Sequence, residues 1–382
     1  MDYEDNFQLQ QQIARLQALL DTSHKIHSTI ELDRVLRSVL QITVRELEMA
    51  GAFFTNFPFS YGDIPPRFLL QPPSSDPGKG CFRFPLLDHT GCELTEMVVI
   101  TRDNAPLSLY EQDFLENLAI QAAVAVENAR YHETTLDMER VKADLDAARE
   151  IQRSLLPQTI PDIPHYSIAS RSQTCYEVGG DYLDIYPLPN GELMLVVADV
   201  AGKGLASALI GSSFRSAFRA IAPSGMSLVE IATHLNKLHF DEGDQARRRY
   251  VTAMFLRLNP REHVLEAVNA GHNPGFIVNG SENPVMIHAS GTPVGMLPFS
   301  TYKEEKFTLG EKSKLLFYTD GMTEVFRGEE EFGQDRLLQT FRSCNSNDPK
   351  AILDSLWQAL DAFTTQETQS DDMTALVVRR KP

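Results

Sequence analysis

The sequence predicts an α+β protein in which two folded parts are joined by one long helix. Its 382 residues exceed the usual size of a single domain, about 150 residues. Between Pro106 and Pro157 there is neither proline nor glycine, which permits one continuous helix. Beyond residue 158, strand-like runs outnumber helical segments and the helices come in pairs. This pattern favours a layered, largely antiparallel domain over a regular βαβ alternation.

The N-terminal part is expected to be a short helix at 1–21 followed by a small α+β domain at 22–130. Apolar residues recur at helical spacing in the first segment, where Leu9 and Ile13 are four residues apart. The domain's expected elements, in chain order, are a helix capped by Ser28 or Thr29, a strand within 50–57, a proline-rich loop at 64–80, and strands at 81–87 and 93–101.

Residues 131–157 are expected to form a coiled-coil linker helix. Apolar side chains are spaced alternately by three and four residues, and Gln152 is a polar interruption that can fix the register. This pattern predicts a homodimer through the linker, whereas the alternative is a helix packed against its own domain. The seam consists of Met138, Val141, Leu145, Ala148, Gln152 and Leu155.

The C-terminal domain is expected to span 158–382. Its predicted strands are 166–172, 192–200, 250–258, 264–270, 314–320 and 374–380, and its predicted helices are 205–222, 226–239 and 348–364.

Aspartates stand at the ends of several of these strands. Asp199 and Asp320 each end an apolar run, and each is followed by a glycine turn. Asp181 follows a glycine pair, while Asp371 and Asp372 open the last strand. One such aspartate alone is more often a turn or cap residue, but four segments that each deliver a carboxylate indicate a shared site.

Carboxylates gathered at one sheet edge repel each other by roughly 4 kcal/mol per pair at 4 Å and an effective dielectric constant of 20. They must therefore take up protons or bind cations. Oxygen ligands without histidine or cysteine partners select Mg²⁺ or Mn²⁺. Two such ions suit the hydrolysis of a phosphate ester, so the residues predict a divalent-metal phosphohydrolase.

The composition excludes several other classes of protein. Lys and Arg number 35 against 52 Asp and Glu, and the net charge of −17 argues against nucleic acid and anionic membranes as partners. No apolar run is long enough to cross a membrane, and the acidic, polar start does not resemble a signal peptide. The four widely spaced cysteines predict reduced thiols in a cytoplasmic protein.

Five motifs carry a resemblance to a known family. GGDYLD, ADVAGKG, NAGHNP, LLFYTDGMTE and SDDMTALVV occur in this order between 179 and 378, after the helical lead-in AREIQRSLLP. Together they resemble the SpoIIE/RsbU-type bacterial PPM serine/threonine phosphatases. The resemblance implies an αββα sandwich, two Mn²⁺ or Mg²⁺ ions, and a phosphorylated partner protein, expected to be a STAS-type anti-sigma-factor antagonist in a partner-switching pathway.

The resemblance also implies roles for individual residues. Asp181, Asp199, Asp320 and Asp371 are expected to be the catalytic metal ligands, with Asp199 bridging and the carbonyl of Val200 also coordinating. Further candidates are Asp184, Asp372, Gly202 and His272. For Asp372 the alternative is that it binds no metal and only supports its neighbour Asp371.

Other residues of these motifs have plainer interpretations. The glycines of ADVAGKG are expected to let the chain turn sharply behind Asp199, and Lys203 is expected to be solvated, since the segment is no P-loop. His272 is expected to lie in a tight turn, with a role near the substrate as the alternative. The basic run 247–249 is expected to be a solvated loop, or else a flap that docks the substrate.

The N-terminal part resembles GAF sensor domains in its opening and closing helices, at 19–54 and 107–133. The leading hypothesis is therefore a phosphoprotein phosphatase regulated by a sensor through a helical dimer linker. Two alternatives are a class III-like nucleotide cyclase, which shares this layout, and a non-catalytic, metal-stabilised module that binds the STAS protein.

Overall fold

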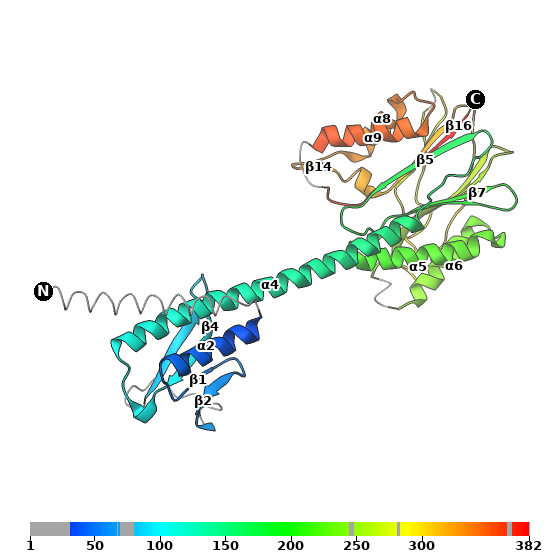
Figure 1. Cartoon of the computed structure of the whole chain (residues 1–382). Coiled ribbons are helices and arrows are strands. Elements are labelled where there is room, and N and C mark those ends of the chain that lie inside the picture. The colour runs from blue at the N-terminus through cyan, green and yellow to red at the C-terminus, as the bar shows by residue number, and fades with distance from the viewer. Residues whose placement is uncertain are drawn as a thin grey trace. The chain divides into compact units, whose positions relative to one another are not determined.

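The computed structural model describes residues 31–66, 68, 80–243, 248–280, 283–364 and 369–381. The chain divides into two compact units, Met1–Lys142 and Ala143–Pro382 (Figure 1). Helix α4 (Leu109–Leu155) is continuous over 47 residues and belongs to both, which confirms the predicted long helix. The helix expected at 1–21 lies outside the described residues.

The N-terminal unit is a four-stranded antiparallel sheet in the order β2-β1-β4-β3, packed against helix α2 and the start of α4. Its strands confirm the predictions for 50–57, 81–87 and 93–101. Helix α2 begins after Glu31, which makes no side-chain cap, and the predicted caps Ser28 and Thr29 lie outside the described residues. The elements are α2 (Leu32–Glu46), β1 (Gly51–Phe54), β2 (Ser60–Gly62), β3 (Cys81–Leu87) and β4 (Glu93–Ile100).

The C-terminal unit contains two five-stranded antiparallel sheets, in the orders β11-β10-β13-β16-β5 and β12-β9-β8-β7-β6. The strands are β5 (Tyr166–Gln173), β6 (Tyr182–Pro187), β7 (Leu193–Val200), β8 (Val251–Asn259), β9 (Val264–Ala270), β10 (Gly275–Val278), β11 (Val285–Ile287), β12 (Glu305–Thr308), β13 (Lys314–Tyr318) and β16 (Met373–Arg380). The helices are α5 (Leu205–Ile221), α6 (Leu228–Asp241), α8 (Gly333–Ser343) and α9 (Pro349–Thr364), and a short hairpin pairs β14 (Phe326–Arg327) with β15 (Glu330–Glu331).

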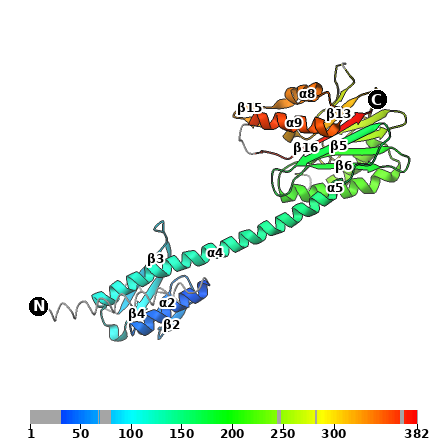
Figure 2. The same cartoon turned by 45° about the horizontal axis from the view of Figure 1, so that its top comes forward.

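The two sheets stack face to face, with α5 and α6 outside one sheet and α8 and α9 outside the other (Figure 2). A third hydrophobic cluster, drawn from both sheets, fills the space between them. The unit is therefore the αββα sandwich that the motifs implied.

Side-chain alternation decides which residues enter the space between the sheets. In β7, Leu193, Leu195 and Val197 belong to the cluster between the sheets, whereas Met194 and Val196 face the helices. Because successive side chains point to opposite faces of a strand, Asp199 at the end of β7 lies on the inner face. The same alternation places Asp181 before β6, Thr319 after β13 and Asp372 before β16 on the inner faces of their sheets.

Asp184 lies on the opposite face of β6, beneath helix α5. It is completely buried, and its carboxylate accepts two hydrogen bonds from Arg219, from Nε at 2.7 Å and from Nη2 at 2.8 Å. The Tyr182 hydroxyl donates a third at 2.5 Å. The structure therefore separates this candidate site residue from the other aspartates, and its charge is paired within the fold.

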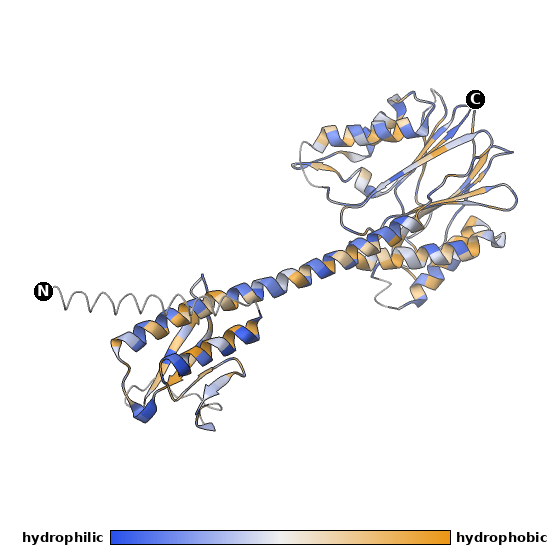
Figure 3. Cartoon of the chain, viewed as in Figure 1, coloured by the Kyte–Doolittle hydropathy of each residue, from blue (hydrophilic) through white to orange (hydrophobic). Residues whose placement is uncertain are grey.

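The middle of α4, residues 130–150, is mostly hydrophilic (Figure 3). Met138 and Val141 of the predicted seam are exposed, at 67% and 59% of their surface. From Leu145 onward the seam residues are half-buried, and Arg215 of α5 donates to the carbonyl of Leu155 at 2.9 Å. The end of the seam thus packs on its own unit, while pairing of the exposed part stays a prediction. None of the described helices is long and apolar enough to span a membrane.

Removing Arg219 should destabilise the C-terminal unit, because it leaves the buried charge of Asp184 without its partner. We expect Arg219→Gln to lower the free energy of unfolding in urea by roughly 3 kcal/mol. The matched control is Arg327→Gln, which breaks an exposed ion pair with Glu330 and should cost less than about 1 kcal/mol. Equal losses in the two variants would contradict the structural role of Asp184.

Candidate active site

Five aspartates from four segments meet at one edge of the sandwich, between the two sheets. Asp181 precedes β6 and Asp199 lies in β7 of one sheet, while Asp320 follows β13 and the pair Asp371–Asp372 precedes β16 of the other. Each sheet therefore contributes part of one acidic cluster, which we define as these five residues.

Asp199 shows how closely the cluster is assembled. Burial is the first cause that raises its pKa from 3.8 to about 7, and the charges of Asp320, Asp371 and Asp372 are the next. Its strongest charged neighbours thus belong to the opposite sheet. The folded protein holds this carboxyl protonated through much of the acidic range unless another cation replaces the proton.

Asp181 is held from the opposite sheet by a threonine. Burial raises its pKa well above 3.8, followed by the charge of Asp199. The hydroxyl of Thr319 donates to its Oδ2 at 2.8 Å, and the amide of Thr374 donates to the same hydroxyl at 3.0 Å. Thr319 is fully buried and lies one residue before Asp320, so it fixes both aspartates together.

The glycine pair before Asp181 lets the backbone approach the cluster. A Cβ atom on Gly180 would lie 2.9 Å from the carbonyl oxygen of Val200 and 3.4 Å from Oδ1 of Asp199. A Cβ on Gly179 would collide with the Asp372 carboxylate. Gly180 thus keeps side-chain atoms away from the Val200 carbonyl, the predicted backbone ligand, and Gly179 makes room for Asp372.

Asp372 supports this glycine segment. Its Oδ1 accepts the amide hydrogen of Cys175 at 2.8 Å, and its Oδ2 accepts that of Gly180 at 2.7 Å. Burial raises its pKa, and these two backbone donors oppose the rise. Both oxygens are engaged by the backbone, which agrees with the alternative that Asp372 acts by positioning its neighbours.

Lys203 is exposed, as expected, and it also contributes a positive charge to the cluster. Its Nζ lies 3.0 Å from Oδ2 of Asp371 and donates to the carbonyl of Ser370 at 2.6 Å. The hydrogen bond to Asp371 is the main cause that raises the pKa of Lys203. Burial and Asp371 raise the pKa of Asp320, while the Gly321 amide and Lys203 lower it.

The turn behind Asp199 requires glycine, as predicted. Gly202 has φ of 99° and Gly204 has φ of 76°, in the region that side chains disfavour. A Cβ on Gly202 would also collide with the guanidinium of Arg249. Arg249 therefore covers this turn, whereas Arg247 of the same basic run lies outside the described residues.

His272 lies between the sheets. The turn predicted for NAGHNP is held by Asn269, whose Oδ1 accepts the His272 amide hydrogen at 2.7 Å and whose Nδ2 donates to the His272 carbonyl at 3.0 Å. The His272 ring hydrogen-bonds through Nδ1 to the hydroxyl of Thr252 at 2.8 Å, and Thr252 pairs with Asp199 across β7 and β8.

The opposite side of the His272 ring faces the other sheet. Burial lowers its pKa to about 4, and the backbone of Tyr318 opposes this only in part. His272 is thus a neutral ring that spans the strands leading to Asp199 and Asp320.

Gln152 links helix α4 to the segment that carries Asp181. Its Nε2 donates to the carbonyl of Gly179 at 2.6 Å, and its Oε1 accepts the Gly179 amide hydrogen at 3.1 Å. The prediction took Gln152 for a register-setting residue between two helices, but the structure gives its amide a partner within the chain. Its seam position, four residues after Ala148, gave no sign of this contact.

The acidic cluster fits hard divalent cations. All its side-chain donors are carboxylate oxygens, the set that Mg²⁺ and Mn²⁺ prefer, and their mutual charge effects mark an excess of negative charge that Lys203 offsets only in part. Among the described residues, no three acidic, histidine or cysteine side chains already converge on a single point.

The metal-free protein should lose stability as the pH rises from about 4 to about 7. The raised pKa of Asp199 means that the folded state binds more protons than the unfolded state in this window, so deprotonation favours unfolding. In chelator, Asp199→Asn should make the slope of unfolding free energy less negative by up to about 1.4 kcal/mol per pH unit. The control is Asp162→Asn at a fully exposed side chain; equal slopes in both variants would refute the assignment.

The C-terminal unit is similar to a family of known proteins. Residues 189–381 match the family model "Stage II sporulation protein E (SpoIIE)". The chain is 30% identical to the phosphoserine phosphatase RsbP of Bacillus subtilis, over 47% of this chain and 45% of RsbP. It is 28% identical to protein IcfG of Synechocystis, over 63% of this chain and 42% of IcfG. The chain thus spans less than half the length of these two relatives.

A solved structure shares the fold. The crystal structure of the RsbU and RsbW domains of Rv1364c from Mycobacterium tuberculosis superposes with a TM-score of 0.51 and 26% identity, covering 58% of this chain and 62% of that one. The family model covers half of the 382 residues, so the chain belongs to the SpoIIE family.

Proposed function

We propose that this protein is a metal-dependent serine/threonine phosphatase that hydrolyses phosphoserine or phosphothreonine on a partner protein. The observation that carries the proposal is the acidic cluster, built from both sheets, in which Asp199 has a pKa of about 7. Family membership and the similarity to RsbP, a phosphoserine phosphatase, support this activity.

Two Mn²⁺ or Mg²⁺ ions would be held by Asp181, Asp199, Asp320 and Asp371, with the Val200 carbonyl beside them. Bound there, such ions supply Lewis-acid activation of the phosphoryl group and a water of lowered pKa. The chain's own residues prepare the site: Thr319 orients Asp181, Asp372 holds the glycine segment, and Lys203 positions Asp371.

The proposed substrate is a STAS-type anti-sigma-factor antagonist. Rv1364c joins an RsbU domain and an RsbW domain in one protein, which supports a place in partner switching. All four cysteines are free, which suits the proposed cytoplasmic location. A cyclase or a non-catalytic binding module would give different outcomes in the experiment that follows.

Purified protein should release phosphate from a phosphoserine peptide only when Mn²⁺ or Mg²⁺ is present. We expect Asp199→Asn and Asp320→Asn to lower kcat by at least about a thousandfold, because each removes a charge that the ions require. His272→Ala should cost less, since that ring supports strands and contacts no reacting group. Malachite-green detection of phosphate measures all three variants.

The control for these variants is Asp162→Asn, which should keep full activity. Undiminished turnover after exhaustive chelation would contradict the metal requirement. Conversion of ATP to a cyclic nucleotide would favour the cyclase. Metal-dependent binding of a phosphorylated STAS protein without phosphate release would favour the non-catalytic module.

We further propose that the N-terminal unit, as a GAF-like sensor, regulates this site through α4 and that paired α4 helices form a homodimer. The support is the Gln152 contact: the helix that begins in the N-terminal unit ends in hydrogen bonds to Gly179, two residues before Asp181. The exposed Met138 and Val141 offer the apolar surface that a second helix would cover.

Gln152→Leu should lower phosphatase activity and raise the Mn²⁺ concentration needed for half-maximal rate. The reason is that Gly179 loses both partners, so the segment that carries Asp181 is held less firmly. Each effect should be about tenfold, because two lost hydrogen bonds of roughly 0.7 kcal/mol each amount to about 1.4 kcal/mol. The matched control is Glu150→Leu, at an exposed position of the same helix; equal effects in both variants would exclude a specific role for Gln152.

A further inference from the structure

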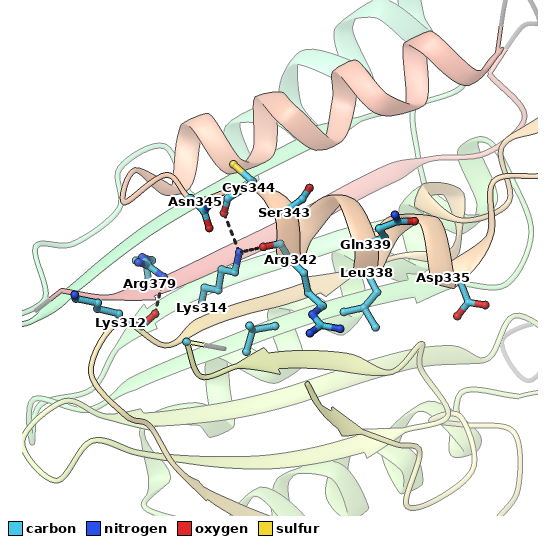
Figure 4. Close-up of a pocket in the computed structure, with 12 residues that line it drawn as sticks. Lys312, Lys314, Asp335, Leu338, Gln339, Arg342, Ser343, Cys344, Asn345 and Arg379 are labelled. Atoms are coloured by element: carbon cyan, nitrogen blue, oxygen red, sulfur yellow. Dashed lines mark hydrogen bonds between the residues drawn. The ribbon is translucent and has the colours of Figure 1, made fainter. Parts of the chain in front are cut away.

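A cavity lies at the end of the sandwich away from the acidic cluster. It has a volume of about 770 Å³ and lies between the C-terminal half of α8 and the ends of β10, β13 and β16 (Figure 4). Lys314 opens β13, whereas Asp320 follows its other end, so the cavity is about 15 Å or more from the cluster at roughly 3.4 Å per strand residue. The cavity is thus independent of the proposed catalytic site.

The cavity collects positive charge in a chain whose net charge is −17. Lys312, Lys314, Arg342 and Arg379 line it, against one carboxylate, Asp335. Among the described residues, no carboxylate forms an ion pair with any of these four cations, whereas Lys203, Arg219, Lys306 and Arg336 elsewhere in the unit each have one. Four cations against one carboxylate give the lining of the cavity a net positive charge.

Two of the cations are fixed in the wall. Lys314 is buried, and its Nζ donates to the carbonyls of Phe341, Arg342 and Cys344 at 2.6, 3.0 and 2.8 Å. Arg379 pairs with it across β13 and β16, and donates to the Lys312 carbonyl at 2.5 Å and to Asn347 at 2.8 Å. Burial lowers the pKa of Lys314, and the charges of Arg379 and Arg342 lower it further, so these cations repel one another.

The other two cations are available to a ligand. The Arg342 side chain extends along the cavity next to Leu338, and Lys312 stands at the opposite end (Figure 4). An arginine fork suits the oxygens of a phosphate group, and the volume is that of a small-molecule site. Val278 and Leu338 add an apolar wall.

We propose that this cavity binds a small anion with two or more phosphate groups, of the pyrophosphate or nucleoside polyphosphate class. The fixed charges of Lys314 and Arg379 set a positive potential, and Arg342 and Lys312 bind the phosphate oxygens directly. This assignment goes beyond the phosphatase activity and does not depend on it.

Isothermal titration of the full chain with pyrophosphate and with ATP, both in EDTA, tests the proposal. Chelation keeps the acidic cluster negative, so that cluster repels these probes. We expect saturable binding of one anion per chain, weakened about tenfold or more in Arg342→Gln and less than twofold in Lys303→Gln, an exposed lysine outside the cavity. Tighter binding of ATP than of pyrophosphate would assign the nucleoside to the apolar wall.

Three outcomes would overturn the proposal. One is no saturation by either probe at millimolar concentration in wild-type protein. Another is equal affinity in Arg342→Gln and Lys303→Gln, with circular dichroism showing both folded. The third is saturable binding of an oligoglutamate peptide but of neither phosphate probe, which would indicate an acidic protein segment as the occupant.

Discussion

The repulsion between buried carboxylates of two opposing sheets is the constraint on which the rest of the C-terminal unit depends. Besides burial, the charges of three aspartates of the opposite sheet raise the pKa of Asp199. The charge of Asp199 in turn helps to raise the pKa of Asp181. The surrounding structure offsets this repulsion locally, with backbone amides on Asp372, the Thr319 hydroxyl on Asp181 and the Lys203 ammonium on Asp371.

The hydrophobic layers determine where this repulsion occurs. Strands β7, β13 and β16 are covered on both faces, by the opposite sheet and by a helix pair, so their apolar residues run almost without interruption and the acidic side chains lie at their ends. A carboxylate on the helix-facing side needs its own cation, as Asp184 has in Arg219. On the inner side, the carboxylates are instead neighbours of other carboxylates, which repel them.

The sequence was informative where local patterns are long. The apolar runs of β7, β9 and β16 and the unbroken stretch of α4 were predicted nearly to their ends, and the strand-end aspartates were predicted as one site. The short strands β10, β11 and β12 and helix α8 were not predicted, because three- or four-residue strands and an 11-residue helix beside a turn carry little periodic signal. Thr319, Lys203 and Gln152 were missed as site residues because their partners are far away in the chain. Asp184 was grouped with the others by its proximity to Asp181, although it is an odd number of residues away and faces the opposite side of the sheet.

The side-chain amide of Gln152 makes two hydrogen bonds to the backbone of Gly179, one as donor and one as acceptor. A glutamine side chain ends in the same chemical group as a peptide bond, so this contact copies one rung of a β-ladder, with a side chain in place of a neighbouring strand. Both bonds depend on the register of the helix. If the helix advances by one residue, it shifts by about 1.5 Å and turns by about 100°, and both bonds are lost together. The two bonds therefore depend on the present register of α4 and are kept or lost together.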